Sequence, residues 1–181
     1  GIVSAEQIAA WEKVCHKVHE NDGKIVMQIM HCGRIAAAAN KPDSARTLAP
    51  STVHAAGKMY TDTDGMVEHD VPLEMTLEDI DQTINDYATA AQKAINIGFD
   101  GVELHATSGY LPAQFLSTGT NQRKDAYGGS LENRLKFTLD VLDAMIYQVG
   151  AGRIGMRICP GNTFNDLHDD DPEQTFAALL D

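Results

Sequence analysis

Two side chains that can donate a proton stand close together in the middle of the chain, just after a short apolar segment. His105 ends the segment Gly101–His105, and Tyr110 follows five residues later, beyond a turn of small residues. Parallel α/β proteins bind their ligands at the carboxyl ends of the strands. There an imidazole N–H can stabilise a developing oxyanion, and a phenol can act as a general acid. Taken alone, a strand-end histidine and a tyrosine under a loop are more often structural.

Two other polar residues interrupt apolar segments that we predict to be strands. Gln28 lies in KIVMQIM (residues 24–30), and Arg157 lies in RIGMRIC (residues 153–159). Burial of either side chain is costly without a polar or charged partner. A glutamine amide donates and accepts at once, which suits the edge of a flavin pyrimidine ring; the alternative is a core glutamine bonded to neighbouring backbone. For Arg157 the alternative to an electron-rich ligand is a core salt bridge, for example with Glu103.

The first half of the chain supplies two helices and a strand. Ser4 to Gln7 form a capping box, and a helix with a buried apolar stripe should follow and stop near residues 21–23. The strand 24–30 is mostly apolar on both faces, as in a buried parallel strand. Residues 31–75 show little periodicity and are predicted to be a long functional or lid-like loop. Thr76 should cap the next helix. The stripe of the first helix comprises Ile8, Trp11, Val14, Cys15 and Val18, and that of the second Ile80, Ile84, Tyr87, Ala91 and Ala94.

The second half continues the alternation. After strand 101–105 and a long polar, Gly-rich loop, Ser130 should cap a helix from Leu131. Strand 153–159 comes next, and Asp171-Pro172 opens a last helix. The stripe predicted for the helix from Leu131 comprises Leu135, Leu139, Leu142 and Ile146. This order of elements indicates an α/β fold with a parallel sheet. Three strands cannot close an eight-stranded barrel, which usually needs about 250 residues.

Composition narrows the class of protein. The 181 residues are 43% apolar, which suits one globular domain, and the net charge of −12 argues against nucleic acid and anionic membrane surfaces as partners. No apolar run is long enough to span a membrane, and the N-terminal residues do not resemble a signal peptide. The three cysteines lack metal-type spacing and are predicted to be reduced thiols in the cytoplasm.

Three segments carry a family resemblance. Residues 98–137 resemble the strand-four signature of the old yellow enzyme family of flavin-dependent ene-reductases, and within them NQRKDAYGGSLENR (residues 121–134) is the most specific match. The segment QIMHCGR (residues 28–34) resembles the family's Q-[LI]-W-H-x-G-R. The resemblance runs from Gly1 into the last helix and is closest to the N-ethylmaleimide and 12-oxophytodienoate reductases. It implies a partial TIM (β/α)8 barrel, with residues 1–181 as a single partial domain holding strands three to five and their helices.

The same resemblance implies an activity and its residues. FMN, reduced by NADPH or NADH, would serve to reduce the C=C bond of an α,β-unsaturated carbonyl or nitro compound. Gln28 and Arg157 would contact FMN, and Tyr110 would supply the proton. His105 and Ser108 would bind the substrate oxygen, although the family carries histidine or asparagine where this chain has Ser108. Met30 replaces a tryptophan that forms a wall of the substrate pocket in much of the family. His31, Arg34 and the loop 121–134 are interpreted as structural.

Two other functions stay open on the residues alone. One is a metal-dependent barrel enzyme that uses His31, Glu103 and His105, since Glu103 and His105 share a strand face. The other is a truncated, catalytically impaired remnant of the family that acts as an interaction module. In the family the FMN phosphate is held around strands seven and eight. A chain of this length is therefore expected to bind FMN weakly or not at all unless self-association or another chain completes the barrel.

Overall fold

The computed structural model describes all residues from 1 to 181 and divides the chain into two compact units. Unit 1 comprises Gly1–Ile29, Asp81–His105 and Asp140–Arg157. Unit 2 comprises Met30–Ile80, Ala106–Leu139 and Ile158–Asp181. No helix in the structure is both long and apolar enough to cross a membrane.

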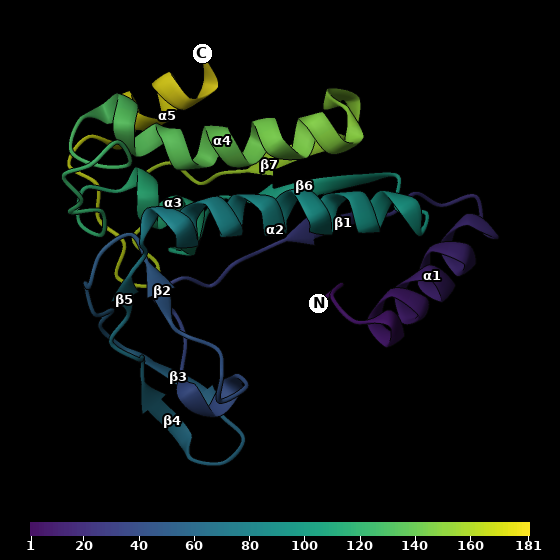
Figure 1. Ribbon diagram of the computed structural model, residues 1–181, viewed down its shortest axis with the longest axis horizontal. Helices are drawn as coiled ribbons and strands as arrows, with labels where there is room; N and C mark the ends of the chain where they lie inside the picture. The colour runs from purple at the N-terminus through teal and green to yellow at the C-terminus, as the bar shows by residue number, and fades with distance from the viewer. The chain divides into compact units, whose positions relative to one another are not determined.

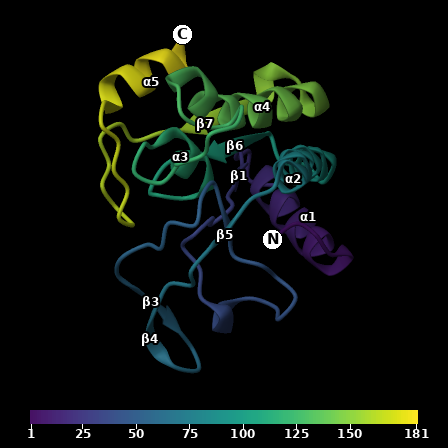
Figure 2. The ribbon, with the colours of Figure 1, turned by 60° about the vertical axis from the view of Figure 1, so that its left-hand side comes forward.

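Unit 1 contains the predicted parallel sheet. Its strands are β1 (Val26–Ile29), β6 (Gly101–His105) and β7 (Ile154–Arg157), in the order β1-β6-β7. Both pairings are parallel, and helices α2 and α4 run alongside the sheet (Figures 1 and 2). This arrangement confirms the predicted α/β class with three parallel strands and flanking helices. The two outer strands are each one or two residues shorter at either end than the predicted segments.

One face of the sheet is covered and the other is open. On the central strand, Val102 and Leu104 are 1% and 0% exposed, whereas Glu103 between them is only partly buried. On β1, Met27 is buried, and its neighbour Gln28 is exposed. Because successive strand residues point to opposite faces, Gln28 and Glu103 share the open face. The prediction that β1 is buried on both faces was therefore wrong, since only one face of this sheet is covered.

Helix α1 (Ala5–His19) begins with the predicted capping box, in which the Ser4 hydroxyl accepts from the Gln7 amide. The helix ends at His19, two residues before the predicted stop at residues 21–23. Its apolar stripe is less buried than predicted: Cys15 is covered, but Trp11 and Val14 are exposed. The Trp11 ring still meets the Phe99 ring at a centroid distance of 5.7 Å. Only part of the apolar stripe of α1 is therefore packed against the rest of unit 1.

The two long helices have the predicted starts. Thr76 caps α2 (Leu77–Asn96), with its hydroxyl accepting from the backbone of Asp79, and Ser130 caps α4 (Leu131–Val149). The α2 stripe is confirmed at Ile80, Tyr87, Ala91 and Ala94, which are all buried, but the α4 stripe was misplaced after Leu135. Leu139 and Ile146 are exposed, and the residues of α4 with no exposed surface are Phe137, Thr138, Val141 and Met145. The helix carries two overlapping apolar series, and periodicity alone does not decide between them. A short 3₁₀ turn, η2 (Ala151–Arg153), leads into β7.

Unit 2 contains regular secondary structure in segments that were predicted to be loops. Residues 31–75 form the 3₁₀ turn η1 (Ala38–Asn40), a parallel pair and an antiparallel hairpin (Figure 2). The parallel pair is β2 (Leu48–Ala49) with β5 (Leu73–Glu74), and the hairpin is β3 (Lys58–Thr61) with β4 (Gly65–Glu68). Inside the predicted polar loop lies helix α3 (Leu111–Leu116), all six residues of which are buried. Helix α5 (Pro172–Leu180) starts at Asp171, as predicted.

Arg34 organises the loops of unit 2, as predicted. Its side chain is 1% exposed, and its two terminal nitrogens donate to backbone carbonyls of two separate loops. The carbonyl acceptors are those of Val53, His54, Asn165 and Asp166. A buried guanidinium needs several acceptors of this kind to replace its lost hydration.

The loop 121–134 has a similar structural role. The Asn121 amide donates to the carbonyls of Phe115 and Tyr127 at 2.7 Å each. The buried Arg123 donates to the carbonyls of Pro50 and Met75, and it forms an ion pair with Asp125. These bonds satisfy backbone groups in a segment without regular structure. The structural interpretation of the most family-specific segment is therefore confirmed.

Candidate active site

Three polar residues meet on the open face of the unit 1 sheet. Gln28 on β1 stands directly opposite Glu103 on β6, and its amide nitrogen Nε2 donates to Glu103 Oε1 at 2.6 Å. Arg157 on β7 donates from Nε to the same Oε1 at 2.9 Å and from Nη2 to Oε2 at 3.5 Å. One residue from each strand of the sheet thus forms a continuous hydrogen-bonded row, with the carboxylate in the middle.

The register explains how Arg157 reaches Glu103. The residue opposite Glu103 on β7 is Gly155, and Arg157 is opposite His105. Gly155 has no side chain, and nothing lies within 4 Å of the position a Cβ would take there. The Arg157 side chain can therefore extend diagonally over the glycine to the carboxylate. The salt bridge that the sequence left as an alternative is present, but the expected burial is wrong, because the Arg157 side chain is 59% exposed.

Charge in the row is balanced around an ionised carboxylate. The bond from Arg157 is the largest cause that holds the pKa of Glu103 below its ordinary value, and the bond from Gln28 and the proximity of His105 act in the same direction. Partial burial opposes them. Glu103 is consequently an acceptor on all sides at neutral pH.

His105 ends the central strand beside this row and is 8% exposed. Burial lowers the pKa of its imidazole below the ordinary 6.5, and the positive charge of Arg157 lowers it further, whereas Glu103 raises it. The neutral imidazole therefore predominates at pH 7. A neutral ring can still donate one N–H to an electron-rich oxygen without placing a full positive charge in the site.

Replacing Arg157 with glutamine should raise the pKa of His105, because the cation that disfavours imidazolium is removed. The pH dependence of the His105 ring resonances in NMR spectra measures this. Arg153→Gln, which changes an exposed arginine four residues earlier, is the matched control and should leave the titration in place. Since the depressed pKa makes the unfolded chain bind more protons, the free energy of unfolding should also fall as the pH drops below about 6.5, less steeply in Arg157→Gln. An unchanged titration in Arg157→Gln would contradict the assignment.

The other predicted site residues belong to unit 2. Ser108 adopts the left-handed conformation, with φ of 58°, and its carbonyl accepts from the Asn165 amide at 2.8 Å. Tyr110 is the N-cap residue of α3 through its backbone, and its phenol takes no part in that cap. The Tyr110 amide donates to Thr107, and its carbonyl accepts from Gln114. Met30, directly after β1, is 47% exposed. The two backbone hydrogen bonds of Tyr110 therefore fix the position of its Cα atom at the start of α3.

The structure does not favour the metal-enzyme alternative. No group of three or more histidine, cysteine, aspartate or glutamate side chains is placed to hold a metal ion. The carboxylate of Glu103 is occupied by Gln28 and Arg157. The Nδ1 atom of His31 instead accepts from the Gly33 amide within its own turn.

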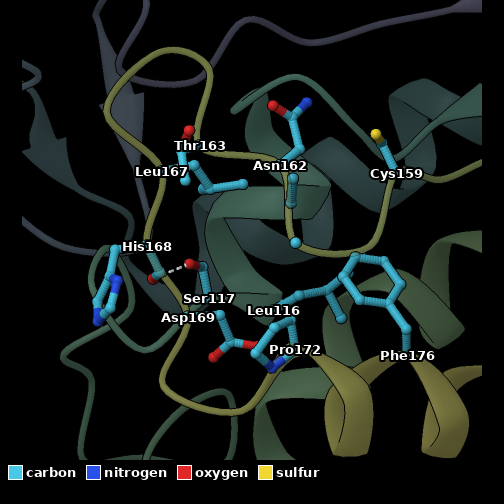
Figure 3. A pocket seen from close by; sticks show the side chains of 12 residues that line it. Leu116, Ser117, Cys159, Asn162, Thr163, Leu167, His168, Asp169, Pro172 and Phe176 are labelled. Carbon is cyan, nitrogen blue, oxygen red and sulfur yellow. Dashed lines mark hydrogen bonds between the residues drawn. The ribbon is translucent and has the colours of Figure 1, made fainter.

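A pocket in unit 2 is formed by α3, the segment after β7 and the start of α5. Figure 3 shows Cys159, Asn162 and Thr163 on one side of it and Pro172 and Phe176 on the other. The Ser117 hydroxyl donates to the carbonyl of His168 at its rim. None of the residues predicted to carry chemistry lines this pocket, so we assign it no part in the reaction.

Comparison with known proteins decides the family. Residues 1–180 match the model of the NADH:flavin oxidoreductase / NADH oxidase family. The chain belongs to this family, that of the old yellow enzymes. It is 44% identical over 177 residues to a probable flavin mononucleotide-dependent alkene reductase of Leishmania infantum, with 96% of this chain and 48% of that protein covered. It is also 39% identical over 172 residues to 12-oxophytodienoate reductase 1 of Oryza sativa, covering 95% of this chain and 44% of that one.

Solved structures agree with the family assignment. Morphinone reductase in complex with tetrahydroNAD superposes with a TM-score of 0.95 at 38% identity, covering 99% of this chain and 51% of that chain. The fold thus corresponds to half of an old yellow enzyme barrel. The chain spans about half the length of the relatives that it matches.

The central position of Glu103 was not predicted from the sequence. Glu103 was predicted as a salt-bridge partner of Arg157 or as a metal ligand, but not as a link between Arg157 and Gln28. The signal was present in the alternation of β6, where a carboxylate stands between Val102 and Leu104. What the sequence lacked was the register that places Gln28 and Arg157 on either side of it.

Proposed function

We propose that this protein is an FMN-dependent oxidoreductase that reduces the activated C=C bond of α,β-unsaturated carbonyl or nitro compounds with NADPH or NADH. We further propose that residues 1–181 form a single partial barrel domain corresponding to strands three to five. The branch we favour is that of the N-ethylmaleimide and 12-oxophytodienoate reductases. The 39% identity to the rice 12-oxophytodienoate reductase supports this placement.

The observation that carries the proposal is the row of Gln28, Glu103 and Arg157 on the open face of the sheet. The pyrimidine edge of a flavin alternates carbonyl acceptors with an imide N–H. Gln28 offers an amide and the half-exposed Arg157 offers guanidinium N–H groups, so this donor set fits such an edge. A cation at that edge also favours the anionic reduced form of a flavin, which is one way in which a protein tunes its cofactor.

The remaining residues would act on the substrate. FMN, when bound, supplies the hydride that it has received from NADPH or NADH. His105, held neutral, and Ser108 would donate hydrogen bonds to the substrate oxygen and so polarise the conjugated double bond. Tyr110 would deliver the proton to the carbon next to the carbonyl. Met30 would form part of the pocket wall.

Flavin binding by the purified chain tests the proposal. We expect a yellow protein where self-association or another chain completes the barrel, and otherwise weak binding seen as quenching of FMN fluorescence on titration. We expect Arg157→Gln to weaken FMN binding by about ten- to hundredfold. Arg153→Gln should bind FMN like the wild type. If the wild-type chain binds no FMN, the alternative of a catalytically impaired remnant that serves as an interaction module replaces this proposal. Light scattering then shows whether it self-associates or needs a completing chain.

Replacing Ser108 with asparagine should tighten the binding of a phenol to the flavin-loaded protein by about five- to fiftyfold. The longer amide reaches further than a hydroxyl, and asparagine tolerates the left-handed backbone at this position well. Titration of the flavin absorption spectrum with 4-nitrophenol measures the affinity. Weaker phenol binding in Ser108→Asn, or undiminished binding in His105→Ala, would contradict the proposed pair of donors.

A cytoplasmic location is part of the proposal as well. All three cysteines are free thiols, with Cys15 buried and Cys32 and Cys159 exposed. Free exposed thiols persist in reducing compartments.

A further inference from the structure

Glu103 bonds to both of the residues proposed to hold the cofactor. Its Oε1 atom accepts from Gln28 at 2.6 Å and from Arg157 at 2.9 Å. No other carboxylate lies in this row. The position of both side chains thus depends on one carboxylate that belongs to the central strand, where it is paired on both sides.

The carboxylate determines which way the Gln28 amide faces. An ionised carboxylate can only accept, so the amide must present its nitrogen to Glu103. The opposite orientation would place two electron-rich oxygens against one another. With Nε2 directed to Glu103, the amide carbonyl Oε1 is the atom left to face a ligand. It is an acceptor, and one N–H of Nε2 remains beside it as a donor.

The same carboxylate accepts hydrogen bonds from two of the three nitrogens of the Arg157 guanidinium. Nε and Nη2 point to Glu103, so the two N–H groups of Nη1 are not engaged by it. A planar guanidinium held through two of its nitrogens cannot rotate freely. The row therefore presents an acceptor on β1 and donors on β7 with fixed orientation.

Resting on the flavin function proposed above, we infer that Glu103 is a positioning residue that fixes the Gln28 amide with its carbonyl toward the ligand, so that the site selects an imide N–H. The ligand class follows from this pattern: a ring whose edge carries an N–H between two carbonyl groups. An N-alkylated imide offers no proton to the Gln28 carbonyl and places a methyl group against it.

Nuclear magnetic resonance of the full chain tests the orientation without any ligand. In the wild type, the Gln28 side-chain amide should resonate downfield at pH 7, because it donates to a charged acceptor. Glu103→Gln should remove this displacement. The amide of Gln92, which donates to the neutral Asn96 side chain, is an internal control and should not move. An unmoved Gln28 resonance would overturn the inference.

Flavin binding tests the consequence. The wild type should bind FMN at least about tenfold more tightly than N3-methyl-FMN, whereas Glu103→Gln, whose freed amide can turn, should discriminate less than about threefold. Glu68→Gln, an exposed change in β4, should keep the wild-type preference. Flavin binding with equal preference in wild type and Glu103→Gln would overturn the role of Glu103 alone. No binding of either flavin by the wild type would overturn the proposed function and the ligand assignment with it.

Discussion

Replacing Tyr110 with phenylalanine should lower the rate of enone reduction by about 10²–10⁴-fold, the usual contribution of a general acid. The oxidation of NADPH or NADH by the flavin-loaded protein, followed without enone, should change little, because no phenol proton is needed there. Rapid-mixing measurements of the two half-reactions separate these rates. The substitution leaves the α3 cap in place, since the cap at Tyr110 is made by the backbone and not by the phenol.

A matched control shows whether the effect is specific to the phenol of Tyr110. Tyr147→Phe removes a phenol that is on α4 and 88% exposed, and it should leave both half-reactions at the wild-type rate. Equal losses in the two half-reactions of Tyr110→Phe would show that the residue positions the site in general. A full rate of enone reduction would show that the proton comes from another group.

Replacing Gly33 with alanine should reduce the free energy of unfolding by about 2–5 kcal/mol, from two effects that add. Gly33 has φ of +61°, which costs a residue with a side chain about 1–2 kcal/mol. An added Cβ would also stand 2.5 Å from Gln114 Nε2, and closer still to Oε1. Overpacking of this kind costs about 1–3 kcal/mol.

Gln114 cannot move aside without loss. Its side chain has no exposed surface, accepts from the Arg34 amide and donates to the carbonyls of Cys32 and Gly109. Displacing it would break three bonds beside the buried Arg34.

Gly65 supplies the control for the Gly33 substitution. Its φ is +68°, close to that of Gly33, but nothing lies within 4 Å of the Cβ position. Gly65→Ala should therefore show only the backbone cost. Urea unfolding of both variants gives the difference, which reports the overlap with Gln114. If the two variants lose the same stability, the contact with Gln114 is not what requires glycine at position 33.

The sequence predicted the elements whose signals are local. The starts of four helices were predicted from their capping residues. A capping side chain bonds to the backbone amide only three residues later, so the motif can be recognised from the sequence alone. The central strand was predicted with its observed bounds, Gly101–His105. Family resemblance supplied the fold, whereas the cofactor of this chain is a proposal that flavin binding tests.

What the sequence did not predict depends on contacts distant in sequence. The hairpin of β3 and β4 lacks a strong alternation, and the α3 segment LPAQFL is too short for a helical period to be visible. The exposure of Arg157 follows from the register of β7 and from the open face, not from its apolar neighbours. Roles for Ser108 and Tyr110 came from family resemblance alone and await the measurements proposed for them.

The pairing order of the sheet has a consequence for how the site moves. Strand β6 is bonded on both sides, whereas β1 and β7 are each bonded on one. An outer strand can detach by breaking a single ladder, while the central strand is released only when both ladders open. Amide hydrogen exchange should therefore be slowest along β6. Glu103 and His105 should keep their positions during brief openings in which Gln28 or Arg157 moves away.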